Sequence, residues 1–123
     1  MAVAILRQGD VLIASVQSDL SDTEVVTLRD TLADRIGDHR VRGIVVDVAG
    51  LDVIDSFLAR ALRAIAVTAR LRGADTVVVG VRPEVAIAMV QFDLNLQPLR
   101  TALDLDEALA SFGRGTEGDE DGP

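Results

Sequence analysis

The sequence predicts a single α/β domain, built on a mostly parallel, mixed sheet of four to five strands with about four helices. Short β-branched segments alternate along the chain with longer segments whose apolar residues recur every three or four positions. Residues 43–48 (GIVVDV) are apolar without alternation, which is typical of a strand covered on both faces. Because strands that alternate with helices form βαβ units, most of the strands should run parallel.

The first half of the domain is expected to open with a hairpin and continue into a helix. Residues 3–6 and 11–16 should form two strands, joined by a turn at Gly9 and Asp10, since both residue types are common in turns. A polar loop follows, and then a helix that Gly37 should end. The apolar face of this helix is expected to consist of Val25, Leu28, Leu32 and Ile36.

The second half should hold three more helices. One is expected to start at Ser56 and to end near Gly73, a residue type that favours helix C-termini. Residues 76–79 predict another buried strand, and Pro83 fits the first turn of the next helix. Residues 94–99 are expected to form a loop with a short edge strand. The last helix should carry the apolar residues Leu105, Ala108, Leu109 and Phe112.

Charge and composition exclude several classes of partner. The 123 residues carry a formal net charge of -8 at pH 7, whereas nucleic acids and anionic membranes attract clustered positive charge. We therefore expect neither as a partner. The start of the chain has no basic leader followed by an apolar run, so we expect a cytoplasmic protein. We expect residues 1–113 to be the folded domain and residues 114–123 to be an acidic disordered tail.

Missing residue types argue against catalysis. The chain has no cysteine, tyrosine or tryptophan, and every Lys/Arg position is arginine. A Walker-type phosphate loop and Schiff-base chemistry both need a lysine, and a thiol nucleophile needs a cysteine. The sequence therefore predicts a protein that is not an enzyme and that holds no cofactor and no metal.

Polar residues gather after the buried strand of residues 43–48, where function is usually found in open α/β sheets. Asp47, Asp52, Asp55 and Ser56 lie here, and the last two stand where a helix should begin. A phosphate on Ser56 would meet the unpaired N–H groups of the helix start. On spacing alone, the simpler interpretation is that Ser56 or Asp55 only caps the helix. A divalent-ion site on the three aspartates is a weaker alternative.

The residues that follow Ser56 could form a partner surface. Phe57 and Leu58 are adjacent, so one should face the core and the other should be available for an apolar contact. Arg60 and Arg63 lie away from the apolar stripe of the predicted helix and should be solvated. Either arginine could instead contact an acidic partner or a phosphate.

The stretch around Ser56 resembles the signature of STAS domains, the anti-sigma-factor antagonists. The resemblance rests on residues 44–48, on Leu51 and on residues 53–56 (VIDS), and the loop containing Asp19, Ser21 and Asp22 stands where that family has a Glu-Leu-Asp type of turn. The order of the predicted elements matches the family from residue 3 to residue 112.

Residues after Ser56 narrow the resemblance to the stressosome scaffold branch of this family, the RsbS type. Phe57 followed by an apolar residue is similar to that branch, as are residues 81–86 (VRPEVA) and 101–105 (TALDL). Simple antagonists have Ser or Thr, then Gly and Leu, at this point. Ser21 departs from the aspartate that is usual in the family.

The resemblance implies a phosphorylation switch. It implies that the unphosphorylated chain assembles with itself and with an RsbR-like co-antagonist carrying a similar domain, and that together they hold an RsbT-like serine/threonine kinase. That kinase would phosphorylate Ser56 and leave, and an RsbX-like phosphatase would reset the site. Asp55, Phe57, Leu58, Arg60, Asp19, Ser21 and Asp22 are the expected surroundings of the switch.

The sequence leaves three alternatives open. The chain could be a direct anti-sigma-factor antagonist that binds an anti-sigma kinase. It could be a small-molecule or nucleotide-binding domain with a pocket over Asp47 and Ser56. It could also be a structural subunit in which Ser56 only caps a helix.

Overall fold

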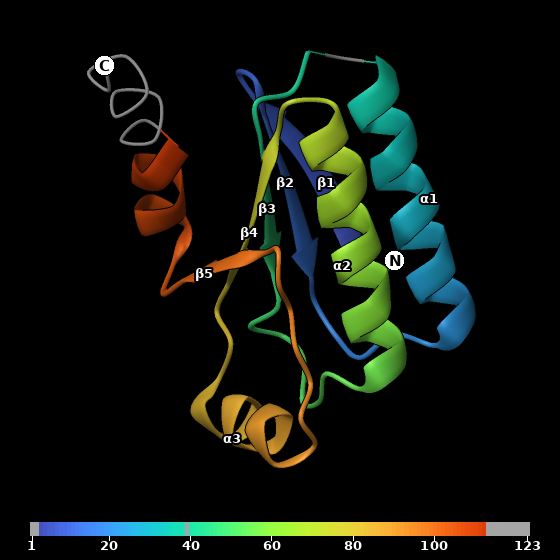
Figure 1. Ribbon diagram of the computed structural model, residues 1–123, viewed down its shortest axis with the longest axis vertical. Coiled ribbons are helices and arrows are strands. Elements are labelled where there is room, and N and C mark those ends of the chain that lie inside the picture. The colour runs from blue at the N-terminus through green and yellow to red at the C-terminus, as the bar shows by residue number, and fades with distance from the viewer. Residues whose placement is uncertain (1–2, 39, 113–123) are drawn as a thin grey trace.

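The computed structural model describes residues 3–38 and 40–112 as one five-stranded sheet with helices on both of its faces (Figure 1). The strands stand side by side in the order of the sequence. They are β1 (Val3–Gln8), β2 (Val11–Val16), β3 (Gly43–Asp47), β4 (Asp75–Val79) and β5 (Arg100–Ala102). The predicted fold class, a mostly parallel mixed sheet, is confirmed.

The hairpin of β1 and β2 provides the antiparallel part of the sheet. Its register runs without interruption from Val3 opposite Val16 to Gln8 opposite Val11. Gly9, the first residue of the turn, has a φ of 61°, a backbone conformation that glycine adopts at little cost. The remaining neighbours, from β2 to β5, pair in parallel, as βαβ connections require.

Two long helices cover one face of the sheet (Figure 1). They are α1 (Asp22–Asp38) and α2 (Ser56–Leu71), which pack against each other. The opposite face is covered by a short helix at residues 105–112. The third helix, α3 (Pro83–Gln91), lies beyond the carboxyl ends of the parallel strands, the same end at which α2 begins.

The sheet separates two hydrophobic clusters. Leu12, Ile44 and Val78 face α1 and α2, and they share a large cluster with Leu32 and Leu62 of these helices. The smaller cluster on the other face is formed by Val11, Ile13, Val45, Val77, Val79, Ala108 and Phe112. Every residue of β3 except Asp47 is buried, so the expectation of a strand covered on both faces is confirmed.

The edge strand expected within residues 94–99 is placed wrongly. These residues form a loop whose Leu96 and Leu99 are buried in the large cluster. Pro98 has no N–H to offer to a strand ladder, and the strand β5 forms after it, at Arg100–Ala102. No apolar alternation marks β5, because its residues are exposed or half-buried.

The predicted tail, residues 114–123, lies outside the described residues. Within the described part of the chain, no helix has the length and apolar character needed to cross a bilayer.

Candidate functional site at the start of α2

Asp55 caps α2. It stands before the first helical residue with extended backbone angles (φ -89°, ψ 177°), and its Oδ1 accepts a hydrogen bond of 2.8 Å from the N–H of Leu58. This side-chain bond satisfies one of the N–H groups that a helix start leaves unpaired. Of the two candidate caps in the sequence, Asp55 is therefore the one in use, and Ser56 is the first residue of the helix.

The side chain of Ser56 is exposed to solvent. Among the described residues, none forms a hydrogen bond with its hydroxyl, and none accepts one from the backbone N–H of Ser56 or Phe57. Ser56 thus combines an accessible hydroxyl with unpaired backbone donors at the positive end of the α2 dipole. An added phosphate group would be stabilised by both features.

Phe57 and Leu58 point to different environments. Leu58 is 5% exposed and belongs to the large core cluster, so its part in the site is the backbone N–H that Asp55 binds. Phe57 is half-buried and borders a small hollow of about 120 Å³ between α1 and α2. The other residues around this hollow are Val25, Val26, Arg29, Arg60, Ala61 and Ala64. Of the predicted apolar pair, Phe57 is the one that a partner could reach.

The two arginines of α2 have different surroundings. Arg60 is exposed, and in the described part of the chain no carboxylate lies within ion-pair distance of it. It follows Ser56 by four residues, the spacing at which two side chains of a helix are neighbours. Arg63 instead donates from Nε to the carbonyl oxygen of Gln97 over 3.2 Å. Arg60 is therefore the cation that could contact a phosphate on Ser56.

Asp19 joins the loop before α1 to the loop before α2. Its Oδ1 accepts a hydrogen bond of 2.9 Å from the N–H of Asp52. The two loops also touch at Gly50, where a Cβ atom would lie 2.5 Å from the carbonyl oxygen of Gln17. The loop that ends at Ser56 is consequently held against the loop that contains Asp19.

Ser21 caps α1 through a reciprocal pair of hydrogen bonds with Glu24. The N–H of Ser21 donates to Glu24 Oε1 over 2.9 Å, and the N–H of Glu24 donates to Ser21 Oγ over 3.2 Å. This is a capping box, in which serine can replace aspartate without loss of the cap. The bonds from the backbone and side chain of Ser21 lower the pKa of Glu24. Asp22, the first residue of α1, is exposed beside this cap.

Arg82 also belongs to the site, although the sequence analysis did not identify it as a site residue. It precedes α3 and donates from Nη2 to the carbonyl oxygen of Leu51 over 2.7 Å and to Asp52 Oδ1 over 2.5 Å. The hydrogen bond to Asp52 raises the pKa of Arg82. Its position just after a buried strand, at the sheet end that also carries Ser56, is the signal that could have identified it.

The site carboxylates are used inside the fold. Asp47 Oδ1 accepts from the N–H of Ala49 over 2.9 Å, Asp52 pairs with Arg82, and Asp55 caps α2. Among residues 3–38 and 40–112, no group of three or more acidic or histidine side chains is placed to hold a metal ion. The site therefore combines an exposed serine hydroxyl with carboxylates that are hydrogen-bonded within the fold.

Comparison with protein families gives a match over most of the chain. The model of the family described as the STAS domain matches residues 2–108. The chain belongs to the STAS domain family. The match includes the loop that contains Asp19 and the loop that ends at Ser56.

Two solved structures are similar to more than nine-tenths of the chain. One is a serine-to-glutamate variant of RsbS from Moorella thermoacetica, with 29% identity and a TM-score of 0.81, covering 95% of this chain and 99% of the other. Another comes from the structure of the stressosome, described as a signal integration and transduction hub, with 29% identity, a TM-score of 0.72 and coverage of 92% and 98%.

Curated relatives include both short and long proteins of Bacillus subtilis. YezB, an uncharacterised protein, is 30% identical over 68% of this chain and 86% of its own length. The RsbT co-antagonist protein RsbRD is 24% identical over 71% of this chain, but the matched part is 31% of RsbRD. The chain therefore corresponds to about a third of that co-antagonist.

Proposed function

We propose that this STAS protein is a stressosome scaffold that holds a serine kinase of the RsbT type and releases it when Ser56 is phosphorylated. The proposal rests on one observation at the start of α2. Asp55 caps the helix, and the hydroxyl of Ser56 stays exposed. Similarity to RsbS over nearly the full length of both chains supports the scaffold role. The RsbT co-antagonist relatives support both the kinase and an RsbR-like partner.

The proposed kinase contact surrounds Ser56 on α1 and α2. Phe57 supplies apolar surface beside the hollow between the two helices, and Arg60 supplies a positive charge next to it. Asp19 and Asp22 provide carboxylates at the neighbouring helix start. An apolar centre with charged groups around it is the usual composition of a protein interface.

Phosphorylation would change this surface in two ways. A phosphoserine carries about -1.5 to -2 charges at pH 7, and Ser56 directly follows Asp55, whose side chain is exposed. The phosphate would also attract Arg60 and withdraw it from a partner. If these effects cost the complex about 3 kcal/mol, the affinity falls roughly a hundredfold, which is enough for a switch. An RsbX-like phosphatase would then restore the binding state.

The experiment that tests this proposal compares kinase binding by charge variants. Calorimetry with the RsbT-type kinase of the same cells should give similar affinities for the wild type and Ser56→Ala, and an affinity roughly a hundredfold lower for Ser56→Asp. The matched control is Thr68→Asp, which adds the same charge to α2 about 18 Å further along the helix.

Equal affinities for Ser56→Asp and the wild type would overturn the switch. Binding of an anti-sigma kinase in place of the RsbT-type kinase would instead make the chain a direct antagonist. A loss of binding that is as large in Thr68→Asp would show a general effect of charge on α2.

A further inference from the structure

The outward face of α2 is cationic. Arg60, Arg63 and Arg70 are exposed there, and the helix (SFLARALRAIAVTARL) contains no aspartate or glutamate. Every other helix of the described residues contains acidic side chains, and those of α1 are Asp22, Glu24, Asp30, Asp34 and Asp38. The chain as a whole has a formal net charge of -8 at pH 7, so α2 concentrates positive charge in an acidic protein.

These three charges are not neutralised within the fold. Among the described residues, no carboxylate lies within ion-pair distance of Arg60, Arg63 or Arg70. The bond that Arg63 forms is to the carbonyl oxygen of Gln97, which carries no net charge. A partner that presents carboxylates could therefore pair with all three arginines.

Exposed apolar side chains lie among the arginines. Ala64, Val67 and Leu71 are spaced by three and four positions, which places them on one side of a helix. Val67 is 49% exposed and Leu71 is 82% exposed. Apolar anchors at this spacing are typical of a surface against which another helix packs.

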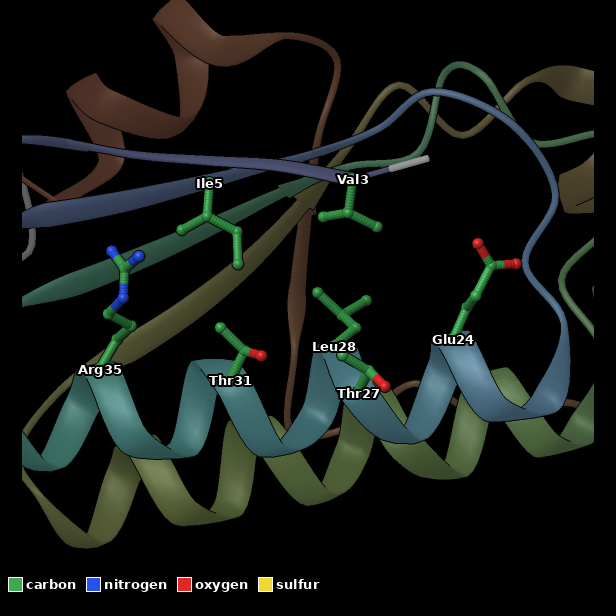
Figure 2. Close-up of a pocket in the computed structure, with 7 residues that line it drawn as sticks. All are labelled: Val3, Ile5, Glu24, Thr27, Leu28, Thr31 and Arg35. Carbon is green, nitrogen blue, oxygen red and sulfur yellow. The ribbon is translucent and has the colours of Figure 1, made fainter. Parts of the chain in front are cut away.

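The groove between β1 and α1 lacks this bias of charge (Figure 2). It has a volume of about 290 Å³, and Val3 and Ile5 of β1 point into it toward α1. Glu24 stands near one end of the groove and Arg35 near the other. Because one negative and one positive side chain border it, this groove does not select the charge of a partner. Only the surface on α2 combines apolar anchors with charge of a single sign.

We propose that the outward face of α2 docks an acidic amphipathic helix of a partner protein, which is the RsbT-type kinase if the proposed function holds. Apolar side chains of that helix pack on Ala64, Val67 and Leu71, and its carboxylates pair with Arg63 and Arg70. α2 has 16 residues and is about 24 Å long. A partner helix of about four turns would use the whole face.

The position of Ser56 on this face explains how a phosphate would release the partner. Ser56 stands 11 residues before Val67, which is about three full turns, so both side chains leave α2 on the same side. A phosphate with about -1.5 to -2 charges would then face the carboxylates of the docked helix. Thr68 is half-buried and turned by about 100° from Val67, so a charge there should act less on this face.

A model peptide tests the surface without any kinase. The probe is a capped peptide of about four turns, with leucine at heptad positions a and d and with alanine and glutamate elsewhere, and its matched copy has lysine in place of glutamate. Titrated into the labelled chain, the acidic peptide should shift the amide resonances of residues 60–71 and bind about tenfold more tightly than the lysine peptide. Added salt should weaken this binding.

Charge variants of the chain show whether the peptide uses α2. Arg70→Glu should weaken binding of the acidic peptide about tenfold. Arg7→Glu is the matched control, because it changes the net charge equally on β1, which β2 and β3 separate from β4, the strand that α2 contacts. Circular dichroism checks the fold, and Arg70→Gln takes the place of Arg70→Glu if that variant unfolds.

Three results would overturn the docking surface. The acidic peptide could leave the amides of α2 unshifted, or the lysine peptide could bind equally well. Arg7→Glu could weaken binding as much as Arg70→Glu. Amide shifts of α2 that depend on the concentration of the chain alone would also overturn it, because the acidic α1 of a second copy would then be the occupant.

Calorimetry with the kinase separates this inference from the proposed function. Arg70→Glu should weaken kinase binding about tenfold, and Arg7→Glu should not. A kinase that responds to Ser56→Asp and not to Arg70→Glu would leave the switch in place and overturn the docking of its helix on α2. A kinase that does not bind the chain, beside an acidic peptide that does, would contradict the proposed function and support the surface.

Discussion

At the start of α2, two neighbouring residues have different surroundings. Asp55 accepts the N–H of Leu58 and closes the helix end, while the Ser56 hydroxyl stays exposed. A serine that served as the cap would lose its hydrogen bond when modified. Because Asp55 does the capping, a phosphate on Ser56 would leave this capping hydrogen bond in place.

This division predicts different stabilities for two alanine variants. Asp55→Ala should lower the free energy of unfolding by about 1 kcal/mol, the usual effect of removing a cap. Ser56→Ala should change it by less than about 0.5 kcal/mol, as is usual for an exposed position. Urea denaturation of both variants checks this, and an equal loss in Ser56→Ala would mean that Ser56 is part of the cap.

At the scale of the elements, the loop before α2 is held by contacts that neighbouring loops make with its backbone. Asp19 binds the N–H of Asp52, Arg82 binds the carbonyl oxygen of Leu51, and Gly50 lies against the backbone of Gln17. These contacts join three loops at one end of the sheet. They give Ser56 a defined position relative to α1.

Gly50 provides a test of this packing. A Cβ atom there would lie 2.5 Å from the carbonyl oxygen of Gln17, so the two loops would have to separate. Gly50→Ala should therefore lower the free energy of unfolding by about 1–3 kcal/mol, as overpacking does. The control is Gly37→Ala in α1, where nothing lies within 4 Å and alanine favours the helix. A Gly50→Ala variant as stable as the control would contradict the close contact.

Elements with strong periodicity could be predicted from the sequence, and loop contacts could not. The buried strand β3 and the start of α2 at Ser56 follow from local pattern, because each needs only its own residues. The pairing of Arg82 with Asp52 joins residues 30 positions apart and depends on the way the loops meet. The prediction placed the last strand too early, at residues 94–99, where Leu96 and Leu99 are apolar. These two side chains are buried in the core, and the strand β5 forms after them.

At the scale of the whole molecule, the elements that form the proposed kinase contact meet at one end of the sheet. The loops before α1 and α2 are joined there by the hydrogen bond between Asp19 and Asp52, and Arg82 before α3 pairs with Asp52. Phe57 and Arg60 border the hollow between α1 and α2. The kinase would therefore contact groups from both helices at once.

Site-resolved mass spectrometry can show whether Ser56 is the switch residue. The purified chain is incubated with Mg-ATP and a lysate of the cells it comes from, beside a Ser56→Ala control. We expect phosphate on Ser56 in the wild type and no phosphate in the control. Phosphate confined to another residue would rule out Ser56 as the switch, and so would an unlabelled chain in a lysate that phosphorylates a known substrate.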